Sequence, residues 1–322
     1  MNLKLWIAFF FCVVGTSSFS QKYDLIETFY LADTSHKVFV NTDDLAKERW
    51  DTLAQPKFWR EVMNLPSDSC IINIAATRKI LGKDSFVAWK KQTEAEKSIY
   101  KDSVRKYYNL EDTVKIYVTS GKSHFYDVTK VMPSISRAVE IFQEYDTDPW
   151  YAQAILLIES PGKMAYSSVG AYGPFQLMKS VAKDHGLIVN KTIDERTDFN
   201  KSAMGASSLL RKTCIPEARR ILRNHNIEYN ENDLWFRLFV LHIYHAGAGN
   251  VQGLMSSINP KHGGQELITT MWQSEWGGFK NASQNYSQVA LASLLRLHDL
   301  IYSSCDNVFD CYPEESLNIE IR

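Results

Sequence analysis

The sequence predicts a mainly α-helical protein, and three stretches support this prediction. Apolar residues recur at helical spacing across 127–145, and the polar stretch 94–108 is rich in helix formers. Asp148 and Pro149 then form a cap and first-turn pair that opens a very apolar segment ending at Glu159. We expect a helix in each stretch.

The rest of the carboxy-terminal half carries the same signals, separated by short loops with Gly, Asn or Pro. This pattern predicts an all-α body. The further helices are expected at 174–185, 199–212, 233–245, 249–258 and 284–303.

Residues 21–126 carry weaker signals. We expect this amino-terminal region to be largely helical, with β character at Lys37–Asn41 and Val114–Thr119. No repeat or low-complexity linker marks a boundary, so we place one at residue 126. The predicted order is therefore a leader at 1–20, this region of unassigned role, a helical domain at 127–303 and a tail at 304–322.

The first twenty residues are typical of a secretory signal peptide. Lys4 precedes an apolar run at 5–15 that is too short to span a bilayer, and cleavage is expected after the small residue Ser20. Cys12 lies inside the apolar run rather than behind small residues, which disfavours a lipoprotein. We expect the mature chain in the periplasm or cell envelope, or secreted.

The charge balance excludes the overall excess of positive charge that is typical of nucleic-acid-binding proteins. The chain has 36 Lys and Arg against 37 Asp and Glu, a formal charge of -1. His242 and His245 lie three apart without a carboxylate at zinc-ligand spacing, which favours structural roles over a metal site.

Four cysteines follow the leader, in a compartment that permits disulfides. Cys305 and Cys311 are close enough in sequence to close a small loop. Cys70 and Cys214 pair only if the fold brings them together, and otherwise remain reduced buried thiols.

The candidate chemistry begins at Glu159. A carboxyl group at the end of a very apolar helix is desolvated, which raises its pKa towards the range that a general acid needs. The small-residue loop at 167–178 follows, where Gly170 and Gly173 permit close approach of the backbone to a ligand. The amide of Gln176 can both donate to and accept from sugar groups.

Three sequence blocks occur in order: Glu-Ser at 159–160 with SSVGAYGPFQLM at 167–178, then IDERTD at 193–198, then YHAGAGNV at 244–251. They resemble the soluble lytic transglycosylase family, and 186–196 is most similar to its membrane-bound lytic transglycosylase D branch. The resemblance covers 127–303.

The resemblance implies a lysozyme-like helical catalytic domain that cuts the β-1,4 bond between N-acetylmuramic acid and N-acetylglucosamine in peptidoglycan glycan strands. It implies no cofactor or metal. Glu159 matches the catalytic glutamate, and we expect Tyr244 to hydrogen-bond it. The substrate-binding residues expected are Ser160, Ser168, Gly173, Gln176, His245 and Ala246.

Two departures from the family pattern have consequences. His245 replaces the usual Asn, and we expect it either to face the glycan cleft or only to pack at the helix end. In the cleft, a cationic imidazole would make activity fall more steeply in mildly acid buffer. The catalytic loop is also slightly shorter, with Pro161-Gly162 in place of a common pair.

A single obvious carboxylate favours a mechanism in which the substrate supplies the nucleophile. Glu159 would protonate the leaving oxygen and then deprotonate the sugar's 6-hydroxyl, which gives a 1,6-anhydromuramyl end. A goose-type lysozyme hydrolysing the same bond, and a non-catalytic cell-wall binding protein, are the alternatives.

Other polar and aromatic groups can have structural rather than functional roles. The charge run at 194–198 is more typical of a solvated cap with local ion pairs than of a second catalytic cluster. Trp272 and Trp276 either stack on sugars or pack against the protein.

Overall fold

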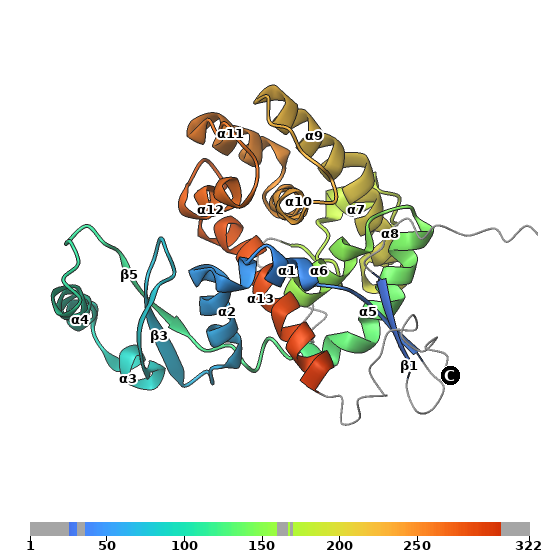
Figure 1. Cartoon of the computed structure of the whole chain (residues 1–322). Coiled ribbons are helices and arrows are strands. Elements are labelled where there is room, and N and C mark those ends of the chain that lie inside the picture. The colour runs from blue at the N-terminus through green and yellow to red at the C-terminus, as the bar shows by residue number, and fades with distance from the viewer. Residues whose placement is uncertain (1–25, 31–35, 160–166, 168–169, 304–322) are drawn as a thin grey trace, which may run out of the picture.

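The computed structural model describes residues 26–30, 36–159, 167 and 170–303, and helices predominate in it (Figure 1). The expectation of a mainly α fold is confirmed. The predicted leader, tail and Cys305 and Cys311 lie outside the described residues.

Helix α6 (Pro149–Glu159) occupies the centre of the helical body (Figure 1). Every residue from 149 to 158 is buried, as expected for a helix that is apolar on all sides. It packs against α5 (Val128–Glu144) and α13 (Asn281–Ser303), and α13 packs in turn on α10 (Leu234–Ala246). The last residue of this buried helix is Glu159.

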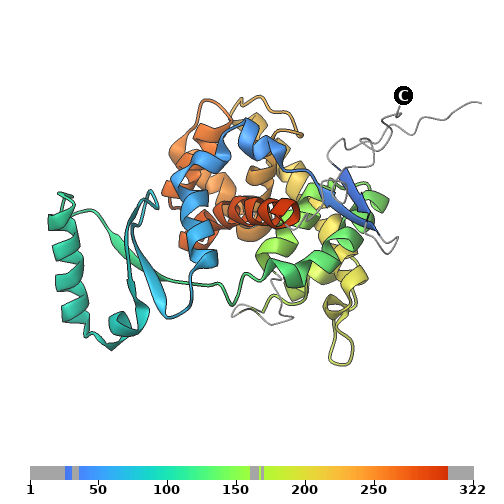
Figure 2. The same cartoon turned by 60° about the horizontal axis from the view of Figure 1, so that its bottom comes forward.

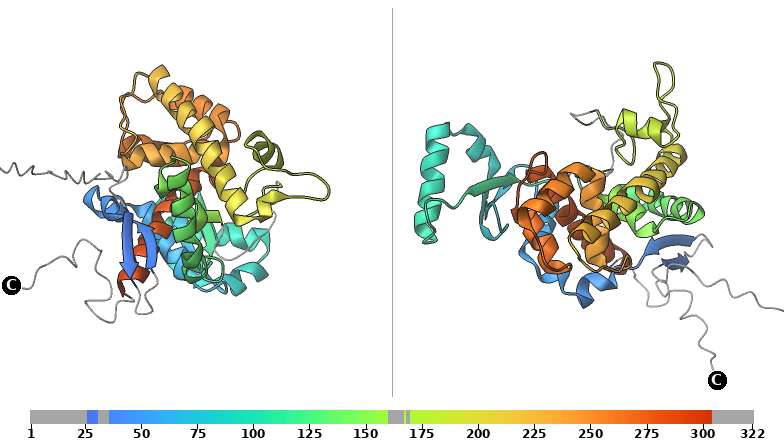
Figure 3. Two further views of the ribbon diagram at one scale, coloured as in Figure 1. Left: turned by 90° about the vertical axis from the view of Figure 1, so that its right-hand side faces the viewer. Right: turned by 90° about the horizontal axis from the view of Figure 1, so that it is seen from above.

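The predicted helix at 174–185 is wrong over its first turn. Helix α7 is limited to Lys179–Asp184, because Tyr172 and Leu177 form an antiparallel bridge and Gln176 adopts a left-handed φ of 46°. The segment between α7 and α8 (Phe199–Leu209) projects from the helical body (Figure 3).

In the described part of 127–303, helices α9 (Ile215–Asn224) and α12 (Gln265–Gln273) and the turn η3 (Leu210–Cys214) were not predicted. The π-helical turn η3 continues α8 into α9, and a proline lies in the first turn of α9. Helix α12 follows α11 (Ala248–Ile258).

The amino-terminal region mixes helices with strands. An antiparallel pair, β1 (Ile26–Tyr30) and β2 (His36–Val40), precedes α1 (Asp43–Lys47), the 3-10 turn η1 (Trp50–Thr52) and α2 (Ala54–Asn64). A three-stranded antiparallel sheet then has the order β4-β3-β5. The strands are β3 (Ser69–Ile74), β4 (Ile80–Ser85) and β5 (Ile116–Ser120). Two helices, α3 (Phe86–Lys91) and α4 (Glu94–Tyr107), connect β4 to β5. The β character predicted near 37–41 and 114–119 is confirmed.

The main hydrophobic core does not divide at residue 126. Trp50, Phe58 and Trp59 are buried together with α5, α6 and α13, and the Trp59 indole donates to Gln288 at 3.2 Å. The sheet has a small core of its own around Ile72, Leu81 and Ile116. Residues 38–71 therefore complete the helical body, whereas the sheet and α4 stand to one side of it (Figure 2).

Cys70 and Cys214 are free thiols in this fold. Cys70 lies in β3 and Cys214 in the π-helical turn, and both are buried. Burial raises the pKa of the Cys214 thiol to about 12, so that the thiol stays protonated. Within the described part of the chain, no helix combines the length and apolarity needed to cross a membrane.

A buried ion pair fixes the start of α6. The Arg237 side chain is 3% exposed and donates from Nε to Asp148 Oδ2 at 2.7 Å, while Asp148 also accepts from the Trp150 amide at 2.9 Å. A buried cation is costly once its counter-charge is removed.

We expect Asp148→Asn, which keeps an oxygen for the cap, to lower the free energy of unfolding by roughly 3 kcal/mol. The matched change Asp299→Asn breaks the exposed pair with Arg60 and should cost less than about 1 kcal/mol. Urea unfolding of both variants measures the difference, and equal losses would contradict a special role for the buried pair.

Candidate active site

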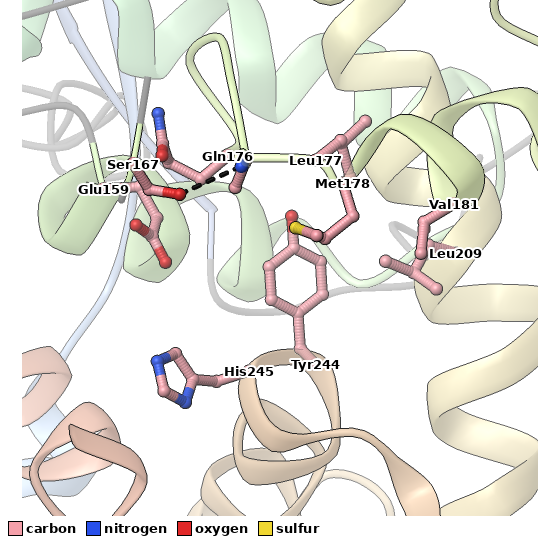
Figure 4. Close-up of a pocket in the computed structure, with 10 residues that line it drawn as sticks. Glu159, Ser167, Gln176, Leu177, Met178, Val181, Leu209, Tyr244 and His245 are labelled. Atoms are coloured by element: carbon pink, nitrogen blue, oxygen red, sulfur yellow. Dashed lines mark hydrogen bonds between the residues drawn. The ribbon is translucent and has the colours of Figure 1, made fainter. Parts of the chain in front are cut away.

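Glu159 lies in a pocket of about 190 Å³ at the junction of α6, α10 and the 167–178 loop (Figure 4). Its carboxyl group points into the space that His245 and Tyr244 face from α10 (Figure 4). Met178, Val181 and Leu209 form an apolar wall. The pocket thus combines one carboxyl group with a largely apolar surround, which suits the predicted acid.

The environment of Glu159 changes its protonation. Burial raises the pKa of its carboxyl group to about 7, because the charged form loses hydration, and the phenol of Tyr286 partly opposes this shift. The group is therefore divided between acid and carboxylate near neutral pH, as a residue needs to be when it both donates and accepts a proton.

Three tyrosines interact electrostatically with the carboxyl group: Tyr126, Tyr244 and Tyr286. Burial, and then the charge of Glu159, raise the pKa of each phenol, so all three remain neutral donors. Tyr126 comes from the chain just before α5, Tyr244 from α10 and Tyr286 from α13. Glu159 thus sits where segments far apart in sequence converge.

Tyr244 does not make the expected hydrogen bond to Glu159. Its hydroxyl donates to the carbonyl oxygen of Phe175 at 2.6 Å, because the side chain reaches from the end of α10 across to the loop. Tyr244 therefore anchors the backbone next to Gln176. Its position in the pocket wall remains compatible with a substrate contact.

Tyr286 is a site residue that the sequence did not predict. It is 4% exposed, and its hydroxyl makes no hydrogen bond of ordinary geometry among the described residues, although it interacts with the carboxyl group of Glu159. The sequence signal was weak: one polar aromatic residue within the apolar face of the predicted helix at 284–303.

The loop that carries Gln176 requires a glycine at residue 173. Gly173 has a φ of 83°, and a Cβ there would lie 1.9 Å from the carbonyl oxygen of Arg196. The Gln176 amide donates to the Gly173 carbonyl at 3.0 Å, and Gln176 lines the pocket as expected. Gly173 is thus placed by packing against Arg196. Ser160, Ser168 and the Pro161-Gly162 pair lie outside the described residues.

Arg196 holds this loop in place. Its Nη1 donates to the carbonyls of Gly170 and Leu177, each at 3.0 Å, and its Nε and Nη2 bind the Asp194 carboxylate at 2.9 and 2.7 Å. Arg196 is 3% exposed, and its hydrogen bonds lower the pKa of Asp194. The 194–198 charge run thus has the expected structural role with a local ion pair, but Arg196 is buried rather than solvated.

His245 lines the pocket, and its ring lies 4.4 Å from that of Tyr286. The atoms packed around the imidazole lower its pKa below the usual 6.5. The loss of activity that we expect when His245 becomes cationic therefore occurs at lower pH than the sequence alone predicts. Ala246, also expected to bind substrate, instead accepts a hydrogen bond from Asn250 on its carbonyl at 2.8 Å.

His242 and Trp272 are packing residues. The His242 imidazole is within 2.8 Å of the Ser287 hydroxyl, and burial lowers its pKa to about 3. Trp272 is 2% exposed and donates to the same Ser287 at 2.7 Å. Trp276 is 44% exposed and packs over Gly253, so only Trp276 of the pair keeps a face that a ligand can reach.

The residues that form the pocket also carry the family signature. Residues 136–261 match the transglycosylase SLT domain family model. This match supports a lytic transglycosylase catalytic domain that acts on peptidoglycan. The SLT domain so defined includes Glu159, the Gln176 loop and Tyr244, whereas Tyr286 lies beyond the matched residues. No curated protein matches the chain.

The tyrosines of the SLT domain pocket make a testable distinction. Because the Tyr286 phenol lowers the pKa of Glu159, Tyr286→Phe should raise that pKa above about 7. Tyr244→Phe should leave the pKa of Glu159 at about 7, since the Tyr244 hydroxyl donates to the carbonyl of Phe175. NMR titration of the Glu159 carboxyl carbon measures both, and an unchanged pKa in Tyr286→Phe would refute the coupling.

Proposed function

We propose that this protein is a peptidoglycan lytic transglycosylase that cleaves the β-1,4 bond between N-acetylmuramic acid and N-acetylglucosamine and leaves 1,6-anhydromuramyl ends. Glu159 is its single general acid and base. The observation that carries the proposal is one carboxyl group with a pKa of about 7, in a pocket of the SLT domain.

The absence of a second carboxylate supports this mechanism over a two-carboxylate one. Glu159 is the only carboxylate among the described residues that line the pocket. The segment 160–170, part of which the structure does not describe, contains no Asp or Glu in the sequence. A two-carboxylate glycosidase needs a partner within about 5 to 9.5 Å.

The substrate supplies the missing nucleophile. Protonated Glu159 donates its proton to the glycosidic oxygen as the bond from C1 to that oxygen breaks. The resulting carboxylate takes the proton of the 6-hydroxyl as that oxygen bonds to C1. One bond is exchanged for another and no water is consumed. Because the hydroxyl belongs to the same sugar, its effective concentration is high.

The pocket walls suit a neutral amphipathic sugar. The Gln176 amide and the Ser167 hydroxyl offer polar contacts, while Met178, Val181 and Leu209 offer apolar ones. Arg196 and Tyr244 act indirectly, since they hold the Gln176 loop through hydrogen bonds to the backbone of 170–177. We regard them as positioning residues.

We further propose that the mature chain works in the periplasm or cell envelope, or outside the cell, where peptidoglycan is found. The proposal rests on the basic start, apolar run and small residues within 1–20.

We expect Glu159→Gln to abolish cleavage of purified sacculi, because the amide keeps the shape but cannot deliver a proton. The loss should be about two to four orders of magnitude. Glu266→Gln, an exposed change in α12, is the matched control and should retain activity. Mass spectrometry of the wild-type digest reports the reaction.

Anhydro ends in that digest support the transglycosylase. Reducing ends alone would instead identify a hydrolase of the goose-lysozyme type, and no products at all would identify a binding protein. Substantial activity in Glu159→Gln would place the acid elsewhere.

The pH dependence follows from the same carboxyl group. The first step needs protonated Glu159, so kcat/KM should fall about tenfold per pH unit above a pH of about 7. His245→Asn should show the same profile as wild type above pH 6.5, because the imidazole is neutral there. Profiles of the two proteins that separate in this range would show that His245 titrates with the reaction.

A further inference from the structure

A second, larger cavity of about 590 Å³ lies between the three-stranded sheet and the helical body. The turn from β3 to β4 and the start of β5 form one wall, and α12 and the first turns of α13 form the other. Figure 2 shows the sheet beside these helices. The cavity is distinct from the Glu159 pocket and shares no lining residue with it.

A buried arginine forms part of its wall. Arg78 is 5% exposed, and its guanidinium lies 5.5 Å from the ring centres of both Phe58 and Tyr117. Nη2 donates to Asn281 Oδ1 at 2.9 Å and to Asn285 Oδ1 at 2.7 Å. These contacts hold the cation at a fixed position between the sheet and α13.

No carboxylate compensates this charge within the described residues. Arg78 takes part in no ion pair there, and both amide oxygens that it contacts bind the same nitrogen, Nη2. Its Nε and Nη1 have no protein partner in the described chain and are not sealed off from solvent. Burial lowers the pKa of Arg78, which shows that the cation is poorly hydrated. An anion in the cavity would relieve this cost.

Other charged side chains on the cavity walls indicate which chemical class of ligand fits the cavity. Lys115 is exposed on the same rim and makes no ion pair among the described residues, and Glu275 lies on the opposite wall. Two cations and one carboxylate complement a molecule that carries more than one carboxylate together with an amine. An acidic peptide with a diamino acid has this chemistry.

We propose that this cavity binds the peptide stems of peptidoglycan, with Arg78 and Lys115 holding stem carboxylates. The inference rests on the proposed function, which makes stem-bearing glycan the substrate. Nη2 is already bound to Asn281 and Asn285, so a stem carboxylate would accept a charge-assisted hydrogen bond from Nη1 or Nε of Arg78.

Helix α13 contributes residues to both sites. Asn281 and Asn285 on this helix contact Arg78, whereas Tyr286, on another face, interacts with Glu159. A helix is about 10 to 12 Å wide with its side chains. An extended stem of four residues spans up to about 13 Å. The proposal requires a stem carried by a sugar near the catalytic pocket to pass around α13 to this cavity.

Calorimetric titration of the full mature chain with the free stem tetrapeptide tests the inference. Wild type should bind the peptide, and amidation of its carboxyl groups should weaken binding at least about tenfold. Lys115→Ala should weaken it about threefold, since the lysine is exposed. Lys79→Ala removes a neighbouring exposed lysine that does not line the cavity and should bind as wild type does.

Arg78→Gln should weaken binding at least about tenfold, because it removes a charged partner. Thermal unfolding shows whether that variant is folded, and the Lys115 and amidation arms do not depend on it. No binding by wild type, equal binding of acid and amide peptides, or equal affinities of Lys115→Ala and Lys79→Ala would overturn the inference.

Stem-free glycan strands separate this inference from the proposed function. If wild type releases anhydro ends from them but does not bind the tetrapeptide, stem binding fails and the function stands. If the tetrapeptide binds in the expected pattern but no anhydro ends form on any substrate, the function fails and the cavity remains a binding site for acidic peptides.

Discussion

The desolvation of Glu159 is the constraint on which the rest of the structure depends. A carboxyl group keeps a pKa of about 7 only where water is excluded from most of its surroundings, and the fold achieves this by placing it at the end of a helix buried on all sides. Helices α5 and α13 pack against α6, α10 packs on α13, and three neutral phenols interact with the carboxyl group of Glu159. The chemistry is thus a consequence of how the helical body is packed.

The walls of the pocket are held by groups that need not touch substrate. Arg196 binds the backbone at both ends of the Gly170–Leu177 turn and is itself fixed by Asp194, while Tyr244 ties the same turn to α10. Gly173 allows the turn to lie against Arg196. The hydrogen bonds that Arg196 and Tyr244 make to the backbone of this turn therefore position Gln176, and a positive charge alone at residue 196 would not replace them.

The amino-terminal region contributes to the same body. Residues 38–71 share its core, and Tyr126 reaches the surroundings of Glu159 from just before α5. The sheet formed by β3, β4 and β5 adds a second wall beyond α13, with Arg78 between the two. The helical body therefore depends on a segment outside residues 136–261, which match the transglycosylase SLT domain model.

The sequence alone determined what depends on local order: the main helices, the strands near residues 37–41 and 114–119, and the position of Glu159 at the end of an apolar helix, because periodicity, caps and a polar residue ending an apolar run are local patterns. Only the tertiary structure decided the partners of Tyr244, the proximity of Tyr286 to Glu159, the separation of Cys70 from Cys214 and the burial of Arg78. Each of these depends on contacts between segments distant in the chain, and such contacts are set by how the helices and the sheet pack rather than by spacing along the sequence.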